Sequence, residues 1–161
     1  MRPHSIQVLV LLMLVSMLTS ASADEKHLLL GTWNVDVSKL EQADPPASVT
    51  MVFADAGGGR YSLSFDIVTR DGQHIHAGNN STFKPDGSLV SVPDSYELDL
   101  VTFSMPNSRT LVMGGALAGH PSHTRIWSLS DDGKSMIETI VGHIDGKTPH
   151  IRTATWTRRR E

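Results

Sequence analysis

The feature that most constrains this chain is a strict alternation of apolar and polar side chains between residues 61 and 67. Tyr61, Leu63, Phe65 and Ile67 alternate with two serines and Asp66. Successive side chains of a β-strand point to opposite faces, so this pattern predicts a strand with one buried face. No helical periodicity persists for three turns anywhere in the chain. The sequence therefore predicts an all-β protein.

Shorter runs of the same kind predict further strands, and turn sequences separate them. The runs cover residues 49–53, 98–105, 109–113, 124–129, 135–141 and 151–157. A change of apolar face predicts a bulge near Leu100 and Val101. Asp-Gly pairs at 71–72, 86–87, 132–133 and 145–146 supply the positive φ angles that tight hairpins need. Because closure removes exposed sheet edges, we expect an up-and-down antiparallel β-barrel of about 8–10 strands.

The two ends of the predicted domain carry matching strands. Residues 30–37 surround Trp33, and residues 154–158 surround Trp156. If the first and last strands stayed apart, both would leave unpaired backbone groups along an edge. We therefore expect these two strands to pair with each other.

Residues 1–23 have the features of a secretory signal peptide. A short start with Arg2 is followed by a long apolar run and by Ala21-Ser22-Ala23, which fits signal-peptidase cleavage after Ala23. The expected mature domain, residues 24–161, would be secreted or periplasmic without a stable membrane anchor. Its 13 basic and 17 acidic residues give no reason to expect nucleic acid as a partner. No cysteine is present, so disulfides play no part in its stability. The oligomeric state stays open.

Several short motifs occur in the order found in a lipocalin-like domain family of small secreted bacterial proteins, most of them of unknown function. Gly31-Thr32-Trp33 is similar to the Gly-x-Trp motif of lipocalins and fatty-acid-binding proteins. The remaining similar motifs are Pro45-Pro46, Asp71-Gly72-Gln73-His74-Ile75-His76, residues 132–136, residues 145–148 and Trp156. Together they extend over nearly all of the chain after residue 23.

This resemblance implies a lipocalin-like, calycin-type barrel that is open at one end and holds a small apolar ligand. It also implies that Arg158 packs over Trp33, as a late arginine does in lipocalins. We therefore assign Gly31, Trp33, Trp156 and Arg158 to closure of the barrel. Fatty-acid-binding proteins carry a helical lid after the first strand, and residues 40–48 are too few for two helices.

The candidate ligand-binding residues are the apolar ones expected to face the barrel interior. They are Tyr61, Leu63, Phe65, Ile67 and Trp127. The alternative is that these side chains form an ordinary filled core, since small barrels either fill their interior or enclose a ligand. The small stock of aromatic residues favours a cavity, but the sequence leaves both interpretations open.

Two histidines raise the question of a metal site. His74 and His76 lie two residues apart on a predicted strand and therefore on one face. Imidazole pairs with this spacing suit a zinc or copper ion. However, no cysteine is present and the sequence identifies no acidic third ligand. We therefore expect neither a metal nor another cofactor, and keep these two histidines as the candidates if one binds.

Enzymatic function receives little support, and no catalytic residue is assigned. The chain has no nucleophile elbow, phosphate-binding glycine loop or metalloprotease helix. Asp66, Asp99 and Glu138 alternate with apolar residues and are interpreted as outward-facing. The expected function is binding of a small apolar molecule. An enzyme with histidines at the barrel mouth and a structural envelope protein without a ligand are the alternatives.

Overall fold

The computed structural model describes residues 28–77, 82–93, 98–144 and 148–160. The predicted signal peptide and the predicted turn at Asp145-Gly146 lie outside these residues, so both remain predictions. Within the described ranges, no helix has the length and apolar character needed to cross a membrane.

The described chain is built from antiparallel strands, and the prediction of an all-β barrel fold is confirmed. Its only other regular element among these residues is a short 3-10 helix, η1 (Val37–Lys39), after the first strand. The strands in chain order are β1 (Gly31–Val35), β2 (Ser48–Gly57), β3 (Arg60–Val68), β4 (His74–Ala77), β5 (Thr82–Phe83), β6 (Asp86–Ser91), β7 (Leu100–Asn107), β8 (Thr110–Leu117), β9 (His120–Leu129), β10 (Ser135–Ile144) and β11 (Thr148–Arg158).

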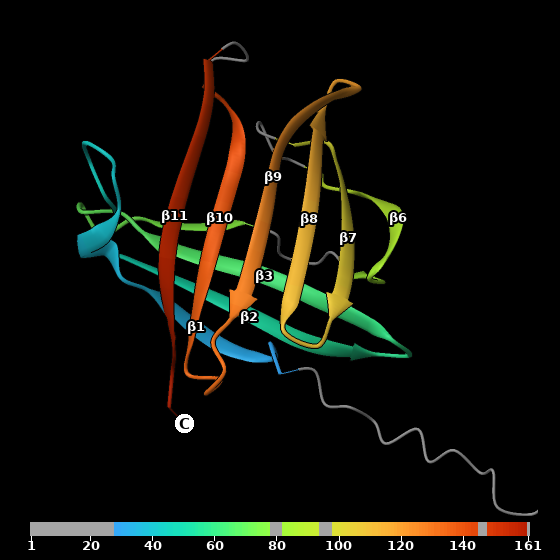
Figure 1. The fold of residues 1–161 in the computed structure, drawn as a ribbon. Coiled ribbons are helices and arrows are strands. Elements are labelled where there is room, and N and C mark those ends of the chain that lie inside the picture. The colour runs from blue at the N-terminus through green and yellow to red at the C-terminus, as the bar shows by residue number, and fades with distance from the viewer. Residues whose placement is uncertain (1–27, 78–81, 94–97, 145–147, 161) are drawn as a thin grey trace, which may run out of the picture.

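The strands form one sheet that curls on itself. The hydrogen-bonded order is β4-β3-β2-β1-β11-β10-β9-β8-β7-β6, so nearly all neighbours in space are neighbours in sequence. The one long-range junction joins β1 to β11, as the sequence predicts, with Trp33 opposite Arg158 and Val35 opposite Trp156. In Figure 1, β1–β3 run at a steep angle across the upright strands β7–β11, so the two parts of the sheet face each other. The core lies between them.

The two ends of this sheet meet through side chains. Strand β5 pairs with β3, lies off the main path and contacts β6. Across this seam, the rings of Phe83 on β5 and Phe103 on β7 stack with centroids 3.7 Å apart. Phe83 also stacks on Phe53 of β2 at 6.1 Å. Among the described residues, aromatic packing therefore joins the ends of the sheet where the backbone ladder stops.

The bulge predicted near Leu100 and Val101 is wrong. These residues pair regularly with Ala116 and Gly115, and the irregularity in β7 lies between Ser104 and Asn107. The apparent change of face arises because β7 begins only at Leu100. Leu98 precedes the strand and packs against the core from a loop, so strand alternation does not apply to it.

Candidate functional site

Trp33 and Arg158 stack on each other at the junction between β1 and β11. Trp33 is fully buried, and the guanidinium carbon of Arg158 lies 4.1 Å from its ring centroid. The Trp33 indole donates to the carbonyl oxygen of Leu29 at 2.9 Å. Arg158 donates from Nη1 to the carbonyl oxygen of Leu30 at 2.6 Å and from Nε to that of Gly133 at 2.9 Å. This arrangement matches what the lipocalin resemblance implies for the two side chains.

Gly31 leaves room for this arginine. Its φ is +141°, and a Cβ built there would lie 2.6 Å from Nη1 of Arg158. Trp156, the fourth residue assigned to closure, does not join the stack. Trp156 lies two residues before Arg158 on β11, is buried opposite Val35, and is tilted against Phe65 with the two ring centroids 6.2 Å apart.

A buried carboxylate lies inside the barrel at Glu138, so the interpretation of this residue as outward-facing is wrong. Glu138 is 2% exposed and is the only buried charged residue in the part of the chain that the structure describes. It pairs in register with Trp127 and Ala154, and both of these are buried. A charge alone predicts an outward position, but Glu138 lies two residues from the core residue Met136 on β10 and therefore shares its buried face.

Glu138 is held by partners on both neighbouring strands. Its Oε1 accepts from Nη1 of Arg125 at 3.1 Å, and its Oε2 accepts from the Trp156 indole at 3.0 Å. Nε of Arg125 in turn donates to Nε2 of His123 at 3.2 Å. We call these four residues the inner polar row. A buried carboxylate needs such pairing, because an unpaired one would cost several kcal/mol.

Three buried nitrogen atoms on the same inner face have no hydrogen-bond partner within the described ranges. They are the indole nitrogen of Trp127 and both ring nitrogens of His150. Trp127 lies in register with Glu138, and His150 lies opposite Gly142, whose other neighbour is His123. The inner face of β9–β11 thus carries polar groups that the described chain does not satisfy.

The predicted ligand-binding residues fall in two places. Tyr61 and Leu63 are buried in the opposite part of the sheet, where Tyr61 stacks on Phe53 with centroids 5.3 Å apart. Phe65 and Ile67 are half-buried on the same strand. Trp127 lies on β9, among the polar groups just described. The four β3 residues therefore line one wall of the interior, and Trp127 belongs to the wall facing them.

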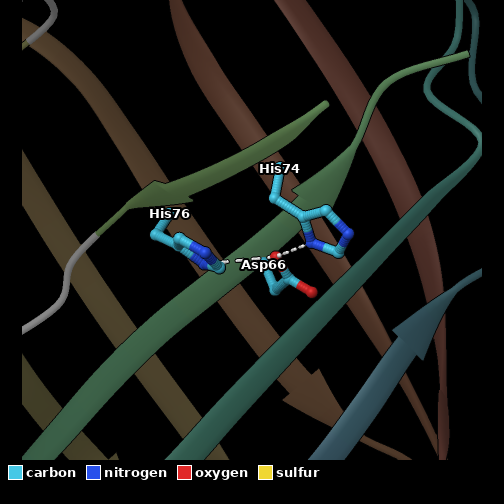
Figure 2. A group of neighbouring side chains, drawn as sticks. All are labelled: Asp66, His74 and His76. Carbon is cyan, nitrogen blue, oxygen red and sulfur yellow. Dashed lines mark hydrogen bonds and ion pairs between the residues drawn. The ribbon is translucent and has the colours of Figure 1, made fainter. Parts of the chain in front are cut away.

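The two candidate metal ligands lie on the outer face of the sheet and meet a third group there. Nδ1 of His74 lies 3.1 Å from Oδ1 of Asp66, and Nδ1 of His76 lies 3.2 Å from the same oxygen. Figure 2 shows the two rings on either side of the Asp66 carboxylate. Sequence reasoning identified the histidines but missed Asp66, because the contact depends on the register between β3 and β4. We call these three residues the outer triad.

A hollow of about 460 Å³ lies elsewhere on the outer surface. Outward-facing side chains of β6, β7, β9 and β10 line it, among them Leu89, Thr102, Thr124 and Val141. These four residues alternate with the buried ones and lie on the outer face of the sheet, and buried Val101 also contributes to the lining.

The chain matches no family model and none of the curated proteins. It does resemble solved structures of the fluorescent protein UnaG. An asparagine-to-alanine mutant of UnaG matches with a TM-score of 0.57 and 12% identity over 83% of this chain and 98% of that protein. Wild-type UnaG matches with a TM-score of 0.53 and 13% identity over 81% of this chain and 97% of that protein. At such identity the likeness concerns the fold alone, an antiparallel β-barrel.

Proposed function

We propose that this chain is a secreted or periplasmic, lipocalin-like protein that binds a small, mainly apolar molecule on the inner face of its barrel. The observation that carries the proposal is the indole N–H of Trp127, which is buried and finds no acceptor among the residues that the structure describes. A buried donor without a partner costs about 1–3 kcal/mol. A site that retains such a donor is expected to meet an acceptor from outside the chain. In this proposal that acceptor is an oxygen atom of the bound molecule.

The surroundings of Trp127 favour a ligand with an apolar body and one polar end. Trp127 pairs with Leu111 on the neighbouring strand β8. The apolar side chains of β3 line the facing wall of the barrel. His150 adds two further unpartnered nitrogen atoms on the same face. Arg125 is engaged by Glu138 but keeps a quarter of its side chain exposed. A hydrogen-bond-accepting group would therefore be stabilised beside Trp127 more than a hydrocarbon would be.

The test compares two fluorescent probes. Anilinonaphthalene sulfonate has an apolar body with an accepting group, whereas pyrene has no acceptor. Trp127→Phe keeps an aromatic ring and removes the donor. We expect it to weaken binding of the sulfonate probe by roughly 2- to 12-fold, which corresponds to one hydrogen bond, and to change pyrene binding little.

Leu89→Ser is the matched control, because Leu89 is 69% exposed and lines the outer hollow. Far-UV and near-UV circular dichroism of each variant verify that it remains folded. If Leu89→Ser weakens both probes while Trp127→Phe weakens neither, small molecules bind outside the barrel and the proposal is wrong.

The export part of the proposal has a separate test. The intact mass of the protein recovered from the periplasm or medium should correspond to a chain that begins at Asp24. Retention of residues 1–23 in a membrane fraction would contradict it.

A further inference from the structure

We propose that the outer triad, Asp66, His74 and His76, binds one divalent transition-metal ion. Two imidazoles and one carboxylate are a donor set that zinc and its neighbours in the first transition row accept. The three side chains come from two adjacent strands, β3 and β4. They lie on the face of the sheet opposite to the barrel interior, so this site is independent of the small-molecule function.

The spacing of the donor atoms fits one ion. One ligand atom from each residue can be chosen so that all three lie within 4.8 Å of one another. Bonds of about 2.0–2.2 Å in a tetrahedral arrangement place neighbouring donors roughly 3.3–3.5 Å apart. The two distances between an imidazole nitrogen and the carboxylate oxygen, 3.1 and 3.2 Å, are close to this value. Small rotations of the exposed side chains suffice to surround a cation.

The backbone already holds the three residues in register. Asp66 pairs directly with His76, and Val68 pairs with His74, so all three side chains project from the same patch. The β3–β4 connection is fixed by hydrogen bonds from the Thr69 amide to the Gln73 carbonyl oxygen and from the Gly72 amide to the Thr69 carbonyl oxygen. Little chain entropy remains to be lost when an ion binds, because the strands are ordered beforehand.

The site is open to water. The side chains of His74 and His76 are each 56% exposed, and that of Asp66 is 40% exposed. Three protein ligands on an exposed face leave a fourth position for water, which is the pattern of exchangeable or catalytic zinc sites and not of closed structural ones. An ion here would be reversibly bound and removable by a chelator without unfolding the barrel.

Binding would also strengthen the attachment of the terminal strand β4, which is already paired with β3. All four residues of β4 are exposed, and β4 is the terminal strand on its side of the sheet. An ion shared by Asp66 of β3 and the histidines of β4 would link the two strands. Slower amide exchange in residues 74–77 should therefore accompany metal binding.

The experiment titrates the protein, purified without a histidine tag, with Zn²⁺ by calorimetry and with Co²⁺ by visible absorption. We expect one equivalent to bind saturably, with slower exchange of the β4 amides. His74→Ala, His76→Ala and Asp66→Asn should each weaken binding by more than the roughly 10- to 100-fold typical of losing an outer-shell partner.

His143→Ala is the control, because this histidine is exposed on another strand. It should leave both titrations unchanged. Circular dichroism of the three triad variants should match the parent protein, because the substituted side chains are on the surface. Absence of saturable binding, or equal binding by the parent and the triad variants, would overturn the proposal.

Discussion

At the scale of single residues, Arg158 connects segments that are far apart in the sequence. One guanidinium contacts the Trp33 ring and donates to carbonyl oxygens that precede β1 and to one in the β9–β10 turn. Burial lowers the pKa of Arg158 from its usual value, but an arginine remains charged under all ordinary conditions. The charge is therefore retained and is satisfied by carbonyl dipoles and the face of the indole, a stack worth roughly 0.5–2 kcal/mol.

The close approach of Arg158 to Gly31 gives the first prediction. Gly31→Ala should destabilise the protein by more than about 1 kcal/mol, because alanine is strained at positive φ and its Cβ would clash with Nη1 of Arg158. Urea unfolding measures the loss. Gly58→Ala is the control, because Gly58 has φ +62° and nothing within 4 Å of a built Cβ. Equal losses for both variants would mean that backbone strain alone matters and that the arginine does not require the glycine.

At the scale of elements, two hairpins use the same turn chemistry. In the β3–β4 turn the Thr69 hydroxyl donates to Asp71, and in the β9–β10 turn the Ser130 hydroxyl donates to Asp132 at 2.7 Å. Each aspartate is followed by a glycine at positive φ, Gly72 at 84° and Gly133 at 69°. The first turn positions the histidines of the outer triad. The second presents its Gly133 carbonyl oxygen to Arg158, so local turn chemistry determines both sites.

These turns predict a loss of stability in acid. The hydroxyl hydrogen bonds lower the pKa of Asp71 and of Asp132 from the usual value. A group with a lowered folded-state pKa stabilises the protein above its unfolded pKa, about 3.9, and this contribution is lost as the pH falls through the folded pKa. The free energy of unfolding, measured with urea between pH 6 and 2, should therefore fall below about pH 4. Asp132→Asn should flatten part of that fall, and an unchanged profile would contradict the assignment.

At the scale of the whole molecule, the barrel is joined in two different ways. On one side β1 and β11 share backbone hydrogen bonds. On the other side, among the residues that the structure describes, β5 lies against β6, and Phe83 of β5 stacks on Phe103 of β7. The β1–β11 junction is held by several backbone hydrogen bonds that support one another. The other junction depends on a stack of two rings and is lost when either ring moves. The aromatic seam is therefore expected to open first.

Phe83→Ala tests this difference. Loss of a buried ring should cost about 3–5 kcal/mol in unfolding free energy, and amide exchange should accelerate most in β6 while β1, β10 and β11 remain the slowest to exchange. Leu89→Ala on β6 is the control, because this side chain is 69% exposed. If exchange in β1 and β11 accelerates as much as exchange in β6, the barrel opens as one unit and the seam has no special weakness.

Most of the strands could be predicted from the alternation of apolar and polar residues alone, although β5, β6 and the buried face of β10 at Glu138 could not. A period of two residues is a local property, and so are the Asp-Gly turns at 71–72 and 132–133, which could therefore be predicted without the fold. The turn predicted at Asp86-Gly87 is wrong, because these residues lie in β6 at a register irregularity against β7. The pairing of the first and last strands also followed, because unpaired edges are costly wherever they occur. His74 and His76 could be placed on one face for the same reason.

Which residues from different strands meet depends on the register and closure of the whole sheet. Asp66 reaches the two histidines through a register between β3 and β4 that no local pattern encodes. The buried position of Glu138 depends on Arg125 and Trp156 from the neighbouring strands, which satisfy its charge. Without knowledge of those partners, a carboxylate is expected to point outward, because burying an unpaired charge costs free energy. Cross-strand contacts of this kind arise from the closure of the whole sheet, and they therefore became known only with the fold.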